Sequence, residues 1–232
     1  MSIHSSASPD FTHLNGLLEP ASPAEIIRWA ATTYAPNLAL TCSFSGASGM
    51  VLLDVMLRVN RDIPVLVLDT DVLFDETYSL IDTVERHYGI AVQRIRPTIT
   101  LDQQAAQHGP DLYAHDPDRC CAIRKVEPLA RALKPYAAWM TALRRDQSST
   151  RASTPVVAWN SKHSLVKICP LATWTERDIW RYINEHDVPY NPLLNQGYTS
   201  IGCHTCTSHP LNGDPRSGRW AGFAKTECGL HG

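Results

Sequence analysis

Residues 38–59, LALTCSFSGASGMVLLDVMLRV, contain the pattern that decides the fold class. Leu38–Phe44 is a short apolar run that predicts a buried strand, and Ser43–Gly49 (SFSGASG) is a turn of small residues. Gly49–Val59 then has the apolar spacing of a helix, with one side formed by Val51, Leu52, Val55 and Val59. A buried strand that leads through such a turn into a helix is typical of α/β proteins.

The alternation of strand and helix continues beyond this segment. Ile63–Asp69 predicts a second strand, Asp75–Tyr88 a helix and Ile90–Arg96 a third strand. This order implies a parallel sheet with right-handed crossovers. Further strands are predicted at Tyr136–Ala142 and Val156–Trp159, and a helix at Thr175–Asp187 with Thr175 as its N-cap.

The domain organisation is predicted from the length of the chain and from a change in composition along it. A chain of 232 residues suggests one domain with an extension, divided here into an N-terminal extension (1–28), an α/β domain (29–213) and a tail (214–232). From Asn191 onward Pro, Gly, Asn and Ser dominate, so we expect a loop-rich region and a tail after Asp214 that moves.

Composition excludes several classes of protein. Hydrophobic residues make up 44% and charged residues 19%, which is typical of a globular domain. We expect a cytoplasmic protein without membrane contact, because neither a membrane-length apolar run nor a secretory leader is present. Residues 1–119 carry a net charge of −8 and residues 120–232 one of +6. The positive part has no Lys/Arg run, so it favours a small anionic ligand over nucleic acid.

The turn at Ser43–Gly46 is a candidate anion site. Ligands of open parallel sheets bind beyond the carboxyl ends of the strands, and a helix N-terminus adds positive potential there. The turn has neither a Walker lysine nor a dinucleotide fingerprint, and an ordinary strand-to-helix turn is the alternative. Thr70 and Asp71, after the second predicted strand, occupy the same rim.

Cysteine gives the most specific signal. The seven cysteines include the adjacent pair Cys120 and Cys121 and a C-x-x-C motif at Cys203 and Cys206. Four thiolates in two pairs suit zinc or a cubane iron–sulfur cluster, and two buried cysteines with an unrelated C-x-x-C are the alternative. Adjacent cysteines on a helix diverge by about 100°, which a cluster with several irons accommodates better than one zinc ion. Arg124 and Lys125 would then offset the charge of a cluster.

Cys228 stands apart, in Lys225–Gly232 (KTECGLHG). A cysteine on a glycine-flanked tail, with a histidine three residues on, is a candidate mobile nucleophile. An incidental thiol on a frayed terminus is the alternative.

The chain resembles the assimilatory adenylyl-sulfate reductases, relatives of the 3′-phosphoadenylyl-sulfate reductases, from about Trp29 to Gly232. The matching segments are SFSG (Ser43–Gly46), LDT (Leu68–Thr70), DPDRCCAIRKVEP (Asp116–Pro128), RRDQSSTRA (Arg144–Ala152), YNPL (Tyr190–Leu193), SIGCHTC (Ser200–Cys206), GRW (Gly218–Trp220) and ECGLH (Glu227–His231). It departs from the family at Ser48–Met50, where an acidic stretch is usual, and at Cys169. We interpret Cys42 and Cys169 as packing cysteines.

The resemblance implies a Rossmann-like fold of the adenine nucleotide alpha hydrolase kind and a set of site residues. Cys120, Cys121, Cys203 and Cys206 would hold a [4Fe-4S] cluster, and Cys228 would be the nucleophile. Ser43, Ser45 and Gly46 would contact the substrate phosphate, and Leu68, Asp69 and Thr70 the adenosine. Lys125, Arg144, Arg145, Arg216, Arg219 and His231 would line the phosphosulfate and the docking path of the tail.

The implied reaction is reduction of adenylyl sulfate to sulfite and AMP through an S-sulfocysteine on Cys228, with thioredoxin or glutaredoxin as reductant. Three alternatives stay open. These are a reductase that uses the 3′-phosphorylated substrate or both substrates, a non-catalytic iron–sulfur or zinc sensor, and an adenylating enzyme of the pyrophosphatase group. The oligomeric state is also open, a homo-oligomer included.

Overall fold

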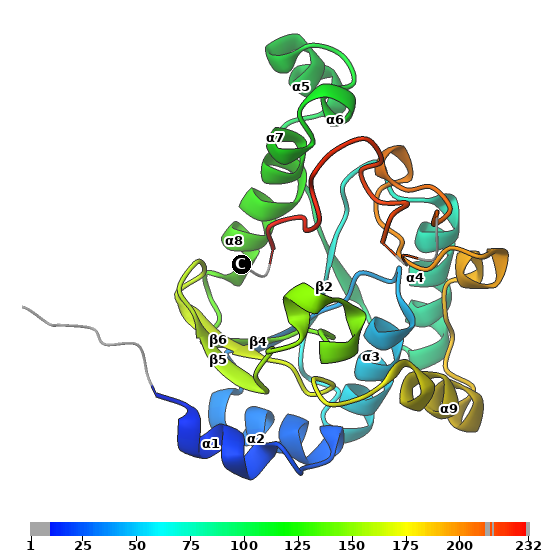
Figure 1. Cartoon of the computed structure of the whole chain (residues 1–232). Coiled ribbons are helices and arrows are strands. Elements are labelled where there is room, and N and C mark those ends of the chain that lie inside the picture. The colour runs from blue at the N-terminus through cyan, green and yellow to red at the C-terminus, as the bar shows by residue number, and fades with distance from the viewer. Residues whose placement is uncertain (1–9, 212–213, 215, 231–232) are drawn as a thin grey trace, which may run out of the picture.

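Six strands form one sheet in the computed structural model, which describes residues 10–211, 214 and 216–230 (Figure 1). The strand order is β3-β2-β1-β4-β6-β5. All neighbours are parallel except β5 and β6, which form an antiparallel hairpin at one edge. The strands are β1 (Leu38–Thr41), β2 (Val65–Leu68), β3 (Val92–Ile95), β4 (Ala138–Met140), β5 (Val157–Asn160) and β6 (Leu165–Ile168). The predicted parallel sheet is confirmed, with β6 as an unpredicted strand inserted between β4 and β5.

Alternate residues of the strands face two different hydrophobic clusters, as the twofold period of a strand requires. Leu38 and Leu40 of β1 belong to the larger cluster, which is covered by helices α2 (Pro23–Tyr34), α3 (Ala47–Val59), α4 (Asp75–Tyr88) and α9 (Glu176–His186). Ala39, between them, belongs to the smaller cluster on the opposite face, covered by α8 (Glu127–Leu133). Both faces of the sheet are therefore buried, as expected of a parallel sheet.

The helix boundaries follow local sequence signals. Helix α4 has the predicted bounds, with Asp75 and Glu76 in its first turn and Gly89 as a left-handed C-cap. Thr175 caps α9 as predicted, through a capping box with Asp178. The described part of the proposed extension 1–28 contains α1 (Thr12–Leu18) and the start of α2. Its boundary lies inside α2, whose apolar face is part of the larger cluster, so this segment packs as part of the domain.

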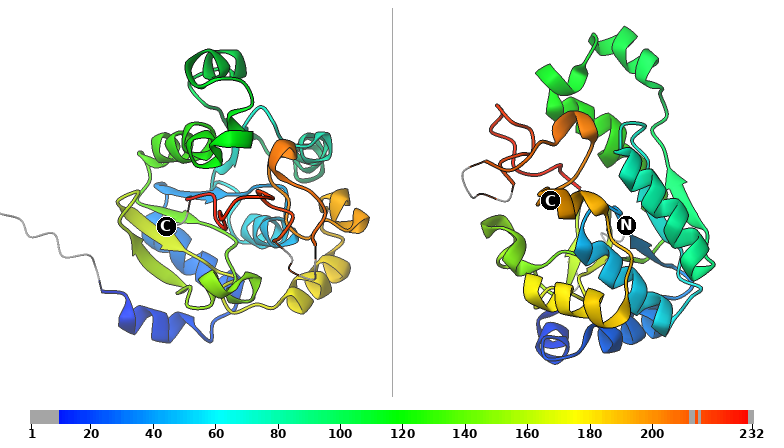
Figure 2. Two further views of the ribbon diagram at one scale, coloured as in Figure 1. Left: turned by 45° about the horizontal axis from the view of Figure 1, so that its top comes forward. Right: turned by 90° about the vertical axis from the view of Figure 1, so that its right-hand side faces the viewer.

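The segment between β3 and β4 projects from the sheet as α5 (Leu101–His108), α6 (Leu112–His115) and α7 (Pro117–Cys121), and it returns through α8 (Figure 2). Ala122–Val126, between α7 and α8, is a π-helical turn. Pro128 explains this turn, because its missing N–H leaves the carbonyl of Arg124 without the usual i−4 donor. The N–H of Glu127 bonds to the carbonyl of Ala122 instead, which is the i−5 spacing of a π-helix.

The region after Asn191 has only short 3₁₀ turns among its described residues, at Pro192–Gln196 and His204–Cys206. It folds over the carboxyl edge of the sheet, and the last described segment runs toward α8 and the β5–β6 hairpin (Figure 1). None of the helices described here has the length and apolar character needed to cross a membrane.

Candidate active site

The turn after β1 leads into α3 without a side-chain cap on that helix. Phe44 is fully buried with φ of 54°, a strained value for a large residue, and its carbonyl accepts from Asn191 Nδ2 at 3.1 Å. Ser45 Oγ donates to the carbonyl of Ser43 at 3.0 Å. Gly46 is the N-cap of α3, and no side chain caps that terminus. The N–H of Gly49 bonds back to the carbonyl of Gly46 at 3.1 Å, so only the earlier N–H groups of this 13-residue helix are left for a ligand.

Two consecutive arginines after β4 point to different surroundings. Arg144 is buried, donates from Nε to Asp146 at 2.9 Å, and contacts the hydroxyl of Ser48 in α3. It therefore joins the loops after β1 and β4, between which the direction of the strand order changes, the usual place for a ligand in such sheets. Arg145 pairs with Glu19 and donates to the carbonyl of Thr154, away from this junction.

The end of β2 carries a network that supports the cysteines. Asp69 accepts from Tyr78 at 2.8 Å and from Arg96 at 2.9 Å. Burial alone would raise the pKa of this carboxyl, but these hydrogen bonds and the charge of Arg96 lower it overall. Thr70 Oγ1 lies 3.3 Å from Cys203 Sγ, and the carbonyl of Thr70 accepts from Arg124 at 2.7 Å. Asp69 and Thr70 are thus engaged in holding the loop that faces Cys203, while Leu68 packs beside the smaller cluster.

The four paired cysteines come together from two distant segments. Cys120 and Cys121 end α7, and Cys203 and Cys206 bound the 3₁₀ turn that pairs with Leu73 after β2. All four are free thiols. Burial, followed by the charges of the nearby Cys121, Cys203 and Cys206 thiols, raises the pKa of Cys120 to about 11, so the four groups influence one another electrostatically.

Lys125 is the buried cation of this site. Burial alone would lower its pKa, but the negative charge of Cys203, Cys121 and Cys228 raises it above its usual value. The effect on Cys203 is reciprocal. Burial would raise the pKa of that thiol, whereas the charge of Lys125, followed by hydrogen bonds from Thr70 and Lys125, lowers it overall. The ammonium group that the π-helical turn carries is therefore within electrostatic reach of both the paired cysteines and the cysteine of the tail.

Arg219 reaches the same region through a tight irregular hairpin. Thr207 and Arg219 form an isolated antiparallel bridge, and the N–H of Trp220 bonds to the carbonyl of Cys206. The guanidinium of Arg219 lies 4.4 Å from the centre of the Trp220 ring, a cation–π contact. Gly218 is required because a Cβ there would lie 2.1 Å from the carbonyl oxygen of Ser208.

Replacing Gly218 with alanine should therefore destabilise the protein by about 1–3 kcal/mol, since the added Cβ forces two backbone segments apart. Gly16→Ala is the matched control, because Gly16 lies exposed in α1 and an added Cβ meets nothing within 4 Å. Removing a helical glycine should raise stability by up to ~1 kcal/mol. Urea unfolding of both variants measures the difference, and equal midpoints would contradict the assigned crowding.

The tail is held by two charged residues that precede Cys228, namely Lys225 and Glu227. Arg151 donates to both carboxylate oxygens of Glu227, at 3.0 and 2.8 Å, and Arg216 contacts the same carboxylate at 3.4 Å. Lys225 pairs with Asp118 of α7. Burial lowers the pKa of Arg216, and Glu227 partly counteracts this. His231, a predicted site residue, lies outside the described residues.

One residue of the site, Arg151, was not singled out from the sequence, and one that was, Arg124, has other partners than expected. Arg151 lies within the segment Arg144–Ala152, but nothing in the sequence indicated its bidentate ion pair with Glu227. Arg124 was expected to offset the charge of a cluster, but its buried guanidinium is occupied by Asp71, Gln104 and the carbonyl of Thr70.

The donor set fits a [4Fe-4S] cluster. Four free thiols share one site with a buried cation, and the described residues contain no three His, Cys, Asp or Glu side chains that converge on a single metal ion. Ligands of a cluster need not converge in this way, because each binds a different iron. Trp220, adjacent to the C-x-x-C turn, has a buried indole N–H without an acceptor among the described residues, which fits a sulfide-rich neighbour.

Cys42 and Cys169 lie outside this group and should be chemically inert. Both are buried, and burial raises the pKa of each to about 12, so the reactive thiolate form is strongly disfavoured. Alkylation of the native protein with iodoacetamide, mapped by peptide mass, should leave both unmodified while Cys228 reacts. Labelling of Cys42 or Cys169 at the rate of Cys228 would contradict their assignment as packing residues.

The chain is similar to several known proteins along most of its length. The model of the phosphoadenosine phosphosulfate reductase domain matches residues 37–209. An adenosine 5′-phosphosulfate reductase of Shouchella clausii is 47% identical over 224 residues, which cover 96% of this chain and 92% of that protein. One from Streptomyces coelicolor is 47% identical over 93% of this chain and 90% of its own.

Solved structures with the same fold were also found. A phosphoadenylyl-sulfate reductase from Candida auris, in a phosphate complex, superposes with a TM-score of 0.75 at 34% identity, covering 84% of this chain and 95% of that one. An FMN adenylyltransferase of Candida glabrata superposes with a TM-score of 0.60 at 13% identity, and the match covers 92% of this chain and 74% of that one. At this identity the likeness shows the fold alone.

Proposed function

This chain belongs to the phosphoadenosine phosphosulfate reductase family, and we propose that it reduces adenylyl sulfate to sulfite and AMP in sulfate assimilation. It is an oxidoreductase acting on a sulfur group, because its curated relatives are named adenosine 5′-phosphosulfate reductases. The observation that carries the residue assignment is the shared site of Cys228, Lys125 and the four paired cysteines.

Nucleotide binding is assigned to the carboxyl edge of the sheet. The N-terminus of α3 and the hydroxyls of Ser43 and Ser45 supply donors for the phosphate, and Arg144 stands across the junction between β1 and β4. Lys125, Arg216 and Arg219 are the cations assigned to the phosphosulfate. Arg145 contributes no donor there, because Glu19 and Thr154 occupy it.

The reaction begins with attack of the Cys228 thiolate on the sulfur of the sulfate group. An S–S bond forms, the bond between that sulfur and the phosphate oxygen breaks, and AMP leaves with the electron pair. Lys125 offsets the repulsion between an anionic nucleophile and an anionic substrate, and it stabilises the charge that develops on the leaving oxygen.

Release of sulfite requires an external dithiol of the thioredoxin or glutaredoxin class. One thiolate attacks Sγ of Cys228 and expels sulfite, and the second thiol then displaces Cys228 as the dithiol becomes a disulfide. Both electrons come from this dithiol. Cys120, Cys121, Cys203 and Cys206 would hold the [4Fe-4S] cluster, whose negative charge, when bound, complements Lys125.

The test is an intact-mass spectrum of anaerobically purified protein after incubation with adenylyl sulfate and no dithiol. A sulfonate adduct that maps to Cys228, and that disappears with release of sulfite when reduced thioredoxin is added, is the expected result. Parallel incubation with the 3′-phosphorylated nucleotide tests the substrate named for the Candida auris neighbour. If neither nucleotide gives an adduct on protein with an intact cluster, the reductase assignment fails and a nucleotide or redox sensor replaces it.

A further inference from the structure

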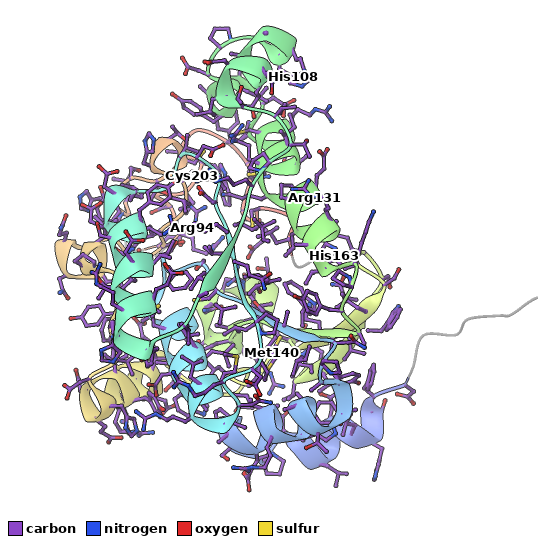
Figure 3. The ribbon with its side chains drawn as sticks, turned by 180° about the vertical axis from the view of Figure 1, so that it is seen from behind. Arg94, His108, Arg131, Met140, His163 and Cys203 are labelled. Atoms are coloured by element: carbon purple, nitrogen blue, oxygen red, sulfur yellow. The ribbon has the colours of Figure 1, made fainter. Side chains whose placement is uncertain are left out.

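The residues that follow Cys228 contact a segment far away in the sequence, the turn Ser161–Ser164 between β5 and β6, here called the β5–β6 turn. Lys162 Nζ donates to the carbonyl of Gly229, and His163 Nε2 lies 3.3 Å from the carbonyl oxygen of Leu230. Because a carbonyl only accepts, Nε2 carries the proton of the neutral imidazole. Cys203 and His163, both labelled in Figure 3, mark the two regions between which the tail runs.

The β5–β6 turn is itself well supported. The N–H of His163 bonds to Asn160 Oδ1 at 2.9 Å, and its ring stands edge-on to Trp139, with ring centres 5.8 Å apart. Trp139 is fully buried in the smaller hydrophobic cluster on the α8 face of the sheet. The donors that hold the tail therefore stand on a rigid part of the domain.

Leu230 and Gly229 complement this turn. The side chain of Leu230 packs half-buried against the smaller cluster, on the same core as the ring of His163. Gly229 has φ of +79°, which favours glycine, and a Cβ there would lie 3.7 Å from both Lys162 Nζ and Val126 Cγ2. Gly229 thus lies between the β5–β6 turn and the π-helical turn that carries Lys125.

We propose that the β5–β6 turn positions the nucleophile: Lys162 and His163 hold the two carbonyl groups that follow Cys228, and Leu230 anchors them on the α8 face. This inference rests on the proposed role of Cys228. Arg151 and Arg216 fix the residue before the thiol through Glu227, so contacts on both sides determine its position. Lys162 and His163 act as positioning residues, since they contact the tail and not the substrate.

The variants separate the hydrogen bonds from packing. The double variant Lys162→Met, His163→Phe removes both donors and keeps the length and the ring. Lys162→Arg with His163→Gln retains a donor at each position and should recover much of the loss. Lys134→Met with His108→Phe is the matched control, because Lys134 is exposed after α8 and His108 ends α5, far from His163 in Figure 3. Thermal unfolding checks that all variants fold.

Two measurements on cluster-loaded protein decide the proposal. Alkylation of Cys228 by iodoacetamide, which needs no nucleotide, should be several-fold faster in the double variant. Single-turnover sulfonation by adenylyl sulfate should be roughly 10- to 100-fold slower, because a small misplacement of a reacting group costs that much, while AMP affinity stays unchanged. If the double variant is alkylated at the wild-type rate, the β5–β6 turn does not hold the tail. If it is alkylated faster but sulfonated at the wild-type rate, the turn holds the tail without positioning the nucleophile for reaction. If wild-type protein forms no adduct, the proposed function fails, and the alkylation rates still decide the docking.

Discussion

Cys228→Ser is expected to abolish sulfite release, with a loss of at least ~10⁴-fold in kcat. A serine hydroxyl is a far weaker nucleophile at neutral pH than a thiolate. Loss of sulfonation should be complete in the mass spectrum. Iron content and AMP affinity should stay at the wild-type level, because Cys228 is assigned neither to the cluster nor to the nucleotide.

Thr226→Ser is the control for this variant. Thr226 is exposed in the same tail, and its contact with Arg216 uses the backbone carbonyl, which the substitution keeps. It should therefore retain wild-type activity. Sulfite production by Cys228→Ser at more than trace rates would remove Cys228 from the mechanism and leave the tail with a docking role alone.

Lys125→Met should slow sulfonation of Cys228 by about 10²–10³-fold, the usual effect of removing one buried donor from a developing charge. Methionine keeps the aliphatic stem but removes the only charge that the π-helical turn directs toward Cys203 and Cys228. Stopped-flow quenching followed by mass analysis measures the sulfonation rate directly. AMP affinity should change much less, because the phosphate of AMP is assigned to the turn after β1.

Lys134→Met provides the matched control, since Lys134 is exposed at the end of α8 and should affect neither rate nor affinity. Iron content must be measured in both variants. A sulfonation rate within two- to threefold of wild type in Lys125→Met, with full iron content, would show that Arg216 and Arg219 suffice for the phosphosulfate.

Sequence signals predicted those elements whose local chemistry and tertiary packing agree. Helix α4 has acidic residues at its start and a glycine at its end, so its bounds matched. The strand predicted at Leu38–Phe44 ends at Thr41, because the chain turns toward α3 there, with Phe44 at positive φ. The short strand β6 was missed, since its place in the sheet depends on pairing with β4 and β5.

The candidate site, like the fold, was predicted only in part. Cysteine spacing indicated the paired thiols, because the chemistry of thiolates is visible in the residues themselves. Which arginine faces the junction was not visible, since Arg144 has extended backbone and neighbouring side chains then point in opposite directions. The partners of the tail were equally hidden, because His163 contacts Leu230 across 67 residues of sequence.

The row of contacts along the tail has a consequence for the second half of the reaction. Each of these contacts is a hydrogen bond or ion pair near the surface, which contributes about 1 kcal/mol to holding the tail. The contacts can therefore break one after another, and the tail does not have to lose all of them at once. The contacts of Gly229 and Leu230 lie beyond Cys228, whereas those of Lys225 and Glu227 precede it. We expect release of the outer two contacts alone to expose the thiol that the proposed reaction sulfonates to the external dithiol, while the inner two keep the tail in place for the next substrate.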